Sequence, residues 1–328
     1  VFGGMDYKIV ENKRKDKFDK NMFIGEQIVQ KNAKAVVKNP RTGKPAAPRL
    51  LGFSGPSLDP SSEPREKLAA WLTAPDHPQF ARVLANRIWY QMMGRGIVDP
   101  VDDFRQTNPP SNPALLDALA RNLVKHGFDL RHLVRVIANS RTYQLSSRPD
   151  STNAADATNF SRALVRRLTA EQMLDAFAQV LDVPVTFSGY DQPLRASQLP
   201  GITAVHRNPN PTPADGFLRQ FGKPDRLLSC ECERSSDTAL GQVFQLVSGP
   251  LLTDLLTRTG GRLDALLDSG KPDRQIIDHL FQAALARPAT EAELKLAGDL
   301  LARPTNRREA LEDIAWSLLN SKEFLLRH

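Results

Sequence analysis

The sequence predicts a mainly α-helical protein with two helical lobes built from αα-hairpins, a long irregular insertion between them, and a short extended or β segment near the N-terminal end. Apolar residues recur at three- and four-residue spacing in one segment after another from Pro64 onward, which is the pattern of amphipathic helices. Clusters of Pro, Gly and Asn separate these segments, as turns between helices require. We expect an N-terminal arm over 1–62, lobe one over 63–181, the insertion over 182–235 and lobe two over 236–328.

The N-terminal arm mixes short β-favouring runs with lysine clusters. The runs cover residues 7–10, 27–30 and 35–37, and they predict either a small hairpin or an extended arm. Residues 39–64 are rich in Pro, Gly and Ser, so we expect an extended linker there.

Lobe one opens with four predicted helices separated by compact turns. They span residues 64–75, 78–93, 113–126 and 130–143. We expect Asp76 and Asn112 to cap the second and third helices, because short polar side chains at these positions accept from free backbone N–H groups. In the fourth helix, the spacing places Val134 on the core face together with its apolar neighbours. A fifth helix over 161–181 completes the lobe.

The insertion has little periodicity and many prolines between residues 182 and 225. Long irregular segments inside compact domains often carry function, so this one is a candidate binding region. Helical spacing resumes in lobe two, where we expect helices over 237–248, 250–258, 263–268, 273–286, 290–301 and 307–320.

The two lobes share an internal echo. A helical hairpin ends at Asn139-Ser140 and is followed by Tyr143, and a second hairpin ends at Asn320-Ser321 and is followed by Phe324. Asn is tolerated in the backbone conformations that end helices. We therefore predict a duplicated unit in which an aromatic side chain folds back after the second helix, with face-to-face packing of the copies as a further hypothesis.

The charge balance is basic but local. Hydrophobic residues make up 41% of the chain and charged residues 25%, which is an ordinary composition for a globular protein. The net charge of +7 is compatible with anionic partners. Much of the excess lies between residues 8 and 44, and elsewhere Arg alternates with Asp and Glu. A solvated surface is therefore favoured over a nucleic-acid face.

One predicted helix does combine basic and aromatic side chains, as a nucleic-acid-binding surface would. It carries Arg82, Asn86, Arg87, Trp89 and Tyr90. Helical spacing, however, places Trp89 with the core residues, and the two arginines can pair with aspartates further along the chain. We expect no nucleic-acid binding here.

The most chemically loaded segment is Ser229-Cys230-Glu231-Cys232-Glu233-Arg234. Cys230 and Cys232 could bind a soft or borderline metal if further ligands such as His206 or His279 joined them. The alternative is structural, with two small side chains on one face of a strand. The chain has no C-x-x-C-H sequence for covalent c-type haem. We predict no cofactor, with a metal at Cys230 and Cys232 as the alternative.

A second candidate site is the acidic loop that contains Asp99, Asp102 and Asp103. Neighbouring carboxylates shift each other's pKa and can serve acid–base chemistry or bind calcium. The alternative is that local caps and pairing with Arg95 and Arg105 hold the loop. We favour this structural interpretation.

Several common sites are missing from the sequence. It has no G-x-S-x-G elbow, no phosphate-binding loop and no dinucleotide fingerprint. No run of about 18 apolar residues predicts a membrane span. The histidines are scattered singly, and we expect His126 and His132 to lie at helix ends. The chain begins at Val1 without a leader, so we expect it to derive from a longer polypeptide.

Several stretches together resemble one known family. They include LAAWLTAPDHPQFARVLANRIWYQ, RALVRRLTAEQMLDA and CECERSSDTALGQVFQLVSGP. From about residue 48 to the end, the chain is similar to the planctomycetal surface domain one family. The resemblance implies a domain near the C-terminal end of exported bacterial proteins, with a cytochrome-like module and often a c-type haem domain upstream. It implies no reaction, and Cys230 and Cys232 match a form of the motif common in that family.

From these observations we expect a non-catalytic binding, scaffolding or docking domain in an extracytoplasmic setting. Its expected partners are other domains of the same protein or a cytochrome-containing protein, with a polysaccharide or envelope surface as a further option. One alternative is a redox accessory or metal-binding module that uses Cys230 and Cys232. Another is a polysaccharide-active hydrolase that uses the loop from Asp99 to Asp103.

Overall fold

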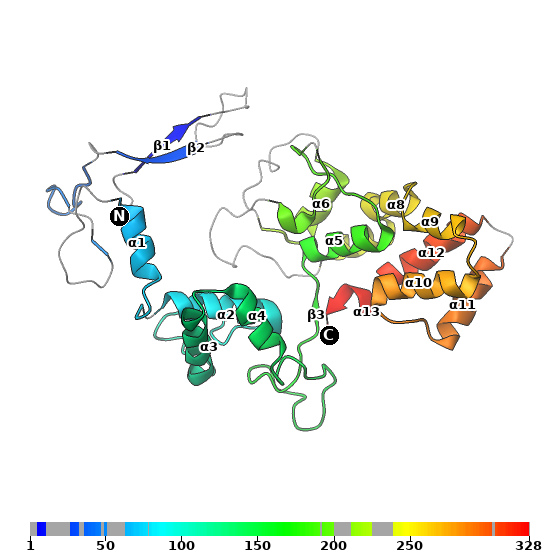
Figure 1. The fold of residues 1–328 in the computed structure, drawn as a ribbon, viewed down its shortest axis with the longest axis horizontal. Helices are drawn as coiled ribbons and strands as arrows, with labels where there is room; N and C mark the ends of the chain where they lie inside the picture. Colours follow the sequence, from blue (N-terminus) through cyan, green and yellow to red (C-terminus); the bar gives the residue numbers. More distant parts are fainter. Residues whose placement is uncertain are drawn as a thin grey trace. The chain divides into compact units, whose positions relative to one another are not determined.

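The computed structural model describes residues 5–10, 27–32, 36–46, 49–50, 63–77, 79–190, 192–199, 211–224, 239–303 and 306–327. Its fold is mainly α with a few short strands, as predicted (Figure 1). The chain divides into two compact units. Unit 1 comprises Val1–Leu145 and Pro149–Arg162, and unit 2 comprises Ser146–Arg148 and Ala163–His328.

A two-stranded hairpin lies near the N-terminal end of unit 1. Strands β1 (Met5–Ile9) and β2 (Gln27–Lys31) pair antiparallel, with Met5 opposite Lys31. The first two β-favouring runs therefore form the hairpin alternative. Of the third predicted run, the described residues 36 and 37 belong to no named strand.

The helices of unit 1 are α1 (Pro64–Leu72), α2 (Phe80–Met93), α3 (Pro113–Lys125) and α4 (Leu130–Ala138). Helix α2 packs against α3 and α4 around a buried core that includes Trp89, Leu123 and Ile137. The predicted cap of α3 is confirmed, because the Asn112 side chain accepts from the Leu115 amide at 3.0 Å. Pro113 lies in the first turn, where a backbone N–H has no partner within the helix, so the missing N–H of proline costs no hydrogen bond.

Three local predictions in unit 1 were wrong. His77, not Asp76, precedes α2 as the acceptor, and its Nδ1 takes a hydrogen bond from the Phe80 amide at 3.0 Å. Val134 is 39% exposed, because the face of α4 that carries Leu133 and Ile137 already fills the contact with α2. The fourth helix ends at Ala138 rather than near residue 143.

The predicted fifth helix is shorter than expected and belongs to unit 2. Helix α5 runs over Ala170–Leu181 and begins at Thr169, whose side chain forms a reciprocal capping box with Gln172. The preceding residues instead form β3 (Arg166–Arg167), which pairs antiparallel with β4 (Leu326–Arg327) near the C-terminal end. The buried face of α5 forms the centre of the unit 2 core, so lobe one does not extend to residue 181.

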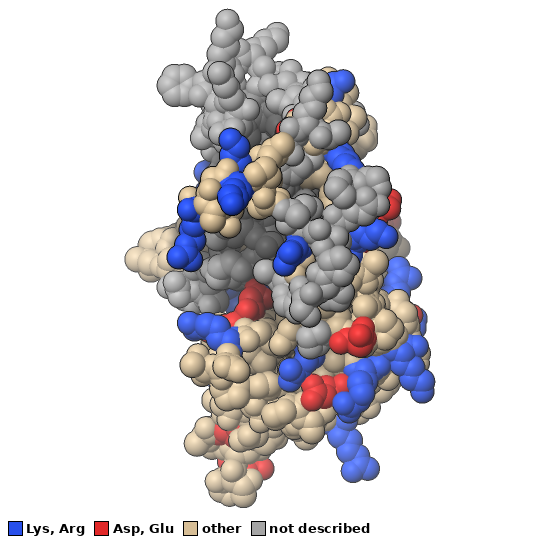
Figure 2. Space-filling model, turned by 90° about the vertical axis from the view of Figure 1, so that its left-hand side faces the viewer, with Lys and Arg blue, Asp and Glu red and all other residues tan. Residues whose placement is uncertain are grey.

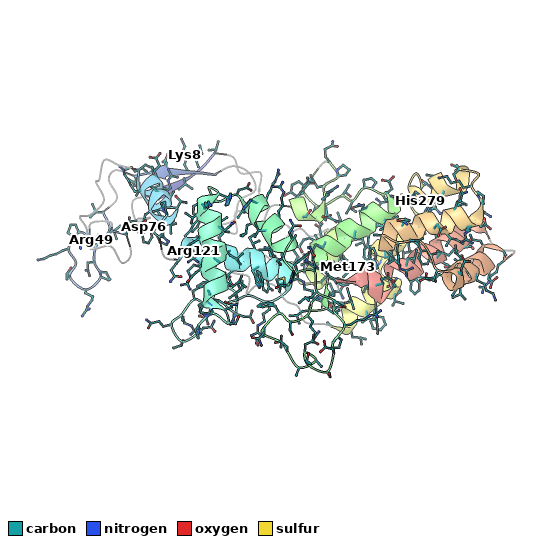
Figure 3. All side chains as sticks on the ribbon, turned by 60° about the horizontal axis from the view of Figure 1, so that its bottom comes forward. Lys8, Arg49, Asp76, Arg121, Met173 and His279 are labelled. Carbon is teal, nitrogen blue, oxygen red and sulfur yellow. The ribbon has the colours of Figure 1, made fainter. Side chains whose placement is uncertain are left out.

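The remaining helices of unit 2 surround α5. They are α6 (Pro213–Gln220), α7 (Leu240–Ser248), α8 (Pro250–Thr257), α9 (Arg262–Asp268), α10 (Asp273–Leu285), α11 (Glu291–Leu301), α12 (Arg307–Leu319) and α13 (Lys322–Leu325). The aromatic centre of the core is Phe177 on α5, which packs against Phe217 at 5.9 Å and Phe324 at 5.6 Å between ring centroids. Met173, labelled in Figure 3, is a fully buried neighbour on the same helix.

The predicted irregular insertion is partly regular. It contains the 3-10 turn η2 (Ala196–Gln198) and helix α6, whose Phe217 and Leu218 are core residues. Thr212 caps α6 together with Asp215, and Pro213 occupies the first helical position. A proline there needs no N–H partner, which is why a residue interpreted as a breaker starts a helix instead.

The internal echo has a local structural counterpart. Helices α2, α3 and α4 contact one another in unit 1, as α10, α11 and α12 do in unit 2. After each third helix, a serine hydroxyl accepts a hydrogen bond from the amide of the aromatic residue three positions later. The pairs are Ser140 with Tyr143 and Ser321 with Phe324, both at 3.2 Å. Each aromatic side chain then packs against the core of its own unit.

Across the parts of the chain that the structure describes, no helix combines the length and the hydropathy needed to cross a bilayer.

Candidate functional site

The acidic loop is anchored to α2 by a fully buried asparagine. The Asn86 Nδ2 atom donates to the carbonyl oxygens of Val98 and Val101, both at 2.9 Å, and its Oδ1 accepts from the Val98 amide at 3.0 Å. Gly96 lies in the same turn, where a Cβ atom would come within 2.1 Å of the Val98 carbonyl oxygen. The backbone of the loop is therefore fixed from inside the unit.

The three candidate carboxylates each face a different arginine. Arg87 Nε donates to Asp102 at 2.7 Å, and Arg95 Nε lies 3.6 Å from Asp99. Both carboxylate oxygens of Asp103 accept from Arg105 at 2.6 Å.

Ion pairing affects the protonation of this loop, as Asp103 shows. The hydrogen bond from the Arg105 side chain holds the pKa of Asp103 below its ordinary value, so this residue stays ionised at neutral pH. A general acid needs the opposite shift. The pairing predicted from the sequence is present, and it also includes Arg82, whose Nε lies 2.9 Å from Asp117.

Two of the five residues that suggested a nucleic-acid face lie in the interior of unit 1. Asn86 and Trp89 are buried, and Trp89 meets Phe160 edge to face at 5.2 Å. On the face drawn in Figure 2, the described basic and acidic side chains are interspersed and do not form one continuous basic surface. Stacking of bases on α2 is therefore excluded for these two residues.

The cysteine-rich segment and its expected helper ligand cannot be placed, since Cys230, Cys232 and His206 lie outside the described residues. His279, which lies on α10 and is labelled in Figure 3, is engaged elsewhere: its Nε2 accepts from Arg262 at 2.8 Å. Burial and then the charge of Arg262 lower the pKa of His279, which favours the neutral ring. Within the described ranges, no three His, Cys, Asp or Glu side chains gather as a metal site.

His126 and His132 lie at helix ends, as expected from the sequence. Their rings stack at 3.7 Å between centroids, and His126 Nδ1 lies 2.8 Å from the Asn122 carbonyl oxygen. The lone pair of an imidazole nitrogen lies in the plane of its ring. Because the two rings are stacked, their lone pairs lie in separate planes and do not point at one common metal ion.

Among the described residues of unit 2, the outer face of α7 carries the largest group of exposed apolar side chains. Four large apolar side chains are exposed there: Leu240 by 70%, Val243 by 47%, Phe244 by 61% and Val247 by 51%. Their spacing at positions i, i+3, i+4 and i+7 places all four on one side of the helix. We call these four residues the α7 stripe.

Helix α7 is held to its unit mainly from the opposite side. The buried Gln242 donates from Nε2 to the Gln220 carbonyl oxygen at 2.9 Å and accepts from Arg167 NH1. Near the other end, Trp316 Nε1 donates to the Val247 carbonyl oxygen at 3.2 Å. The helix thus faces inward with these polar anchors and with Leu246, and it presents the α7 stripe outward.

Two arginines without a carboxylate partner among the described residues adjoin α7. Burial lowers the pKa of Arg167, whose contacts are Gln242 and, at 5.5 Å, the ring of Phe221. Arg219 is exposed at the end of α6, next to the residue that binds Gln242.

The sequence analysis missed the α7 stripe. The apolar spacing was visible, but the same spacing marks a core-facing helix in the usual case. The one local signal was Gln242, since a glutamine on the inward side of a helix requires buried polar partners.

Residues 64–301 match the PSD1 family, which is described as a protein of unknown function (DUF1553). The chain belongs to the PSD1 family. The match agrees with the sequence resemblance as far as membership of this family of unknown function, and it assigns no reaction. No curated protein and no solved structure gives a significant match.

The matched span begins at the first residue of α1 and ends at the last residue of α11. The PSD1 region thus includes the acidic loop and the α7 stripe. Helix α12 and Phe324 follow that span, although both contribute to the core of unit 2. The folded unit is therefore longer than the matched region.

Proposed function

We propose that this PSD1 chain is a non-catalytic docking module and that the α7 stripe is its binding surface. We also infer, from the family resemblance of the sequence, that it works outside the cytoplasm beside cytochrome-type modules of an exported bacterial protein. The observation that carries the docking role is the exposure of four large apolar side chains on one short helix.

Contiguous apolar surface of this kind is uncommon on a protein that acts alone. Single exposed apolar residues are normal, whereas a patch of several hundred Å² with a polar rim marks an interaction site. The exposed Ser248 lies on α7 beside the stripe and forms part of such a rim. Covering the stripe with a partner would remove this apolar area from water.

The acidic loop supports the same conclusion from another direction. Its backbone is fixed by Asn86, and its carboxylates are occupied by arginines. These contacts account for the loop as a structural element of unit 1. A glycoside hydrolase would instead need one of two facing carboxyl groups to hold a proton at working pH.

Site-specific photocrosslinking tests the docking role. A benzophenone amino acid replaces Phe244 in the full exported protein, and a matched control carries it at Leu296, a lone residue on α11 that is 68% exposed. We expect a defined crosslinked partner or partner domain from position 244 and none from position 296. Equal labelling from both positions, or none from either, would contradict the proposal, as would a crosslink from position 244 back to unit 1.

A further inference from the structure

We propose that Arg262 and His279 form a proton-controlled latch on the C-terminal end of α5, closed at neutral pH and open in acid. The latch lies within unit 2, where both α9 and α10 contact α5. It is independent of the docking role proposed above and concerns a conformational response of the fold.

Arg262, the first residue of α9, caps α5 from a distant part of the chain. Its Nε donates to the Val180 carbonyl oxygen at 2.6 Å, and its NH2 group donates to the Gln179 carbonyl oxygen at 3.2 Å. Carbonyl groups in the last turn of a helix have no partner within the helix, and the helix dipole favours a cation there. One side chain therefore satisfies two carbonyl groups at the end of α5.

The third contact of this guanidinium fixes the state of His279. The NH1 group of Arg262 lies 2.8 Å from Nε2 of His279, which is labelled in Figure 3. A guanidinium has only donors and stays protonated in proteins, so Nε2 must accept with its lone pair. The ring is therefore neutral, with its proton on Nδ1, whenever this contact is formed.

The surroundings of His279 oppose a charged ring. Burial lowers its pKa most, and the positive charges of Arg262 and Lys271 lower it further. The side chain nevertheless remains exposed, so protons reach the ring from solvent. The ring can therefore respond to pH while the contact with Arg262 resists its protonation.

The acidic side chains near this junction do not offset the two cations. They are Asp182, which ends α5, Asp264 on α9, and Asp278 on α10. The Asp264 carboxylate accepts from the Gly260 amide at 2.6 Å, and the Asp278 carboxylate accepts from the Ala289 amide at 3.1 Å. None of the three is among the charges that shift the pKa of His279.

Protonation of His279 breaks the contact. An imidazolium carries N–H groups on both nitrogens, so Nε2 no longer accepts, and two cations then face each other. Arg262 cannot release its own proton. The guanidinium therefore moves away from the ring, and its hydrogen bonds to the carbonyl groups of α5 weaken.

The close packing of the junction converts this change into an opening. At Gly261, a Cβ atom would lie 2.7 Å from the Leu181 carbonyl oxygen and 2.8 Å from Cγ2 of Val183. The start of α9 thus lies directly on the end of α5. Val183 and the nearby Phe187 are buried core residues. Movement of Arg262 therefore loosens the last turn of α5 and the buried segment that follows it.

The sign of the pH dependence follows from the lowered pKa of His279. The unfolded chain has the ordinary histidine value of 6.5, so it binds the proton first as the pH falls. The stabilisation from the closed latch is complete above that value. It decreases below it and is lost once the pH has passed the folded-state pKa.

Hydrogen exchange of the full chain, followed by mass spectrometry at about pH 7.5 and about pH 5, tests the latch. The reporter is the peptide over 179–188, in which the Asp182 and Val183 amides both donate to the Ala178 carbonyl oxygen. After correction for the intrinsic pH dependence of exchange, the protection of this peptide should fall at least about three-fold in acid. Nitrogen NMR of the histidine rings should show the proton on Nδ1 of His279 at neutral pH.

Three variants assign the response to the latch. His279→Gln offers Arg262 a neutral acceptor at every pH, so it should keep the protection seen at neutral pH and lose the acid response. Arg262→Ala removes the cap itself and should increase exchange at both pH values. His126→Gln, at an exposed histidine of unit 1, is the matched control and should leave the acid response unchanged. Circular dichroism confirms that each variant keeps its helix content.

Several results would overturn the inference. Equal protection of the reporter peptide at the two pH values would show that no latch opens. A full acid response in His279→Gln would assign the titration to another group. A proton on Nε2 of His279 at neutral pH would contradict the contact with Arg262. The NMR measurement needs no variant, so it decides the question even where a substitution prevents folding.

Discussion

Arg287 and Glu293 form a two-bond ion pair at the start of α11, with NH1 to Oε2 and NH2 to Oε1 both at 2.9 Å. The same guanidinium binds both carboxylate oxygens of Glu323, at 2.7 and 2.8 Å. Glu293 also accepts from the amide and hydroxyl of Thr290, so it serves the cap of α11 and the ion pair together. One arginine thereby joins the end of α10 to the starts of α11 and α13.

This arrangement predicts a loss of stability in acid. The Arg287 hydrogen bonds lower the pKa of Glu293 to about 2 from its ordinary value of 4.5. Because the folded-state pKa is the lower one, the stabilisation is complete above about pH 4.5 and disappears as pH falls toward 2. Glu293→Gln should flatten the acid limb of the urea-unfolding profile in this window. The effect should stay below about 1 kcal/mol, because the pair is partly exposed and solvent screens it.

The matched control for that variant is Glu291→Gln. Glu291 also lies in the first turn of α11 and pairs with Arg274 at 2.6 Å, but its side chain is 79% exposed. Its replacement should leave the acid limb unchanged. An equal response of both variants would show that the helix dipole, rather than Arg287, sets the acid sensitivity.

Removal of the buried anchor of the acidic loop should be costly. Asn86→Ala leaves the Val98 amide and two carbonyl oxygens without their partner inside unit 1. We expect a loss of about 2–4 kcal/mol in the free energy of unfolding, measured by urea denaturation with tryptophan fluorescence. Gln275→Ala, at an exposed position of α10, should cost almost nothing. A similar small effect for Asn86 would mean that water replaces its three hydrogen bonds.

The hydrolase alternative for the acidic loop has a direct test. Asp102→Asn and Asp103→Asn should lower the melting temperature, because each removes one partner of an arginine. Neither should change binding or cleavage of a panel of polysaccharides. A variant that kept the melting temperature and lost turnover would instead place these carboxylates in a catalytic site.

The cysteine segment gives a separate prediction about metal and redox chemistry. A docking role predicts that purified protein holds no stoichiometric metal and that Cys230→Ser/Cys232→Ser keeps the crosslink formed from position 244. Elemental analysis by mass spectrometry and thiol titration measure this. One equivalent of bound metal that is lost in the double variant would favour the metal-binding alternative.

The repeated serine caps should behave alike. Ser140→Ala and Ser321→Ala each remove the acceptor for the amide of the following aromatic residue, Tyr143 or Phe324. A lost cap of this type costs about 1 kcal/mol. Thermal unfolding of the two single variants and the double variant should show comparable and additive losses, since the caps lie in different units. A silent Ser140→Ala would show that the shared cap geometry contributes no stability in unit 1.

The parts of the fold that were predicted correctly depend on local chemistry. The Asn112-Pro113 start of α3 is readable because cap and first-turn preferences act within a few residues. The partners of α5 were not readable in the same way. Helix α5 packs in unit 2 through contacts of Phe177 with Phe217 and Phe324, which are far apart in the sequence. Spacing identifies an apolar face but does not identify what covers it.

The same limit explains the candidate sites. The ion pairs of the acidic loop followed from charges close together in the chain, and the structure contains them. The α7 stripe did not follow, because an exposed row and a buried row of apolar residues have identical periodicity. The contacts of Gln242 with Gln220 and of Leu246 with the core show which side of α7 faces inward.

The main part of unit 2 runs from Ala163 to His328. Strands β3 and β4 lie near the two ends of this part and pair with each other. Arg166 lies opposite Arg327, and the Leu168 amide donates to the Leu325 carbonyl oxygen at 3.1 Å. Because the strands are antiparallel, a stretching force on the chain enters and leaves at the same end of this ladder. Such a force peels the hydrogen bonds apart one after another instead of shearing them together. We therefore expect this ladder to open before tension reaches the helices between its strands.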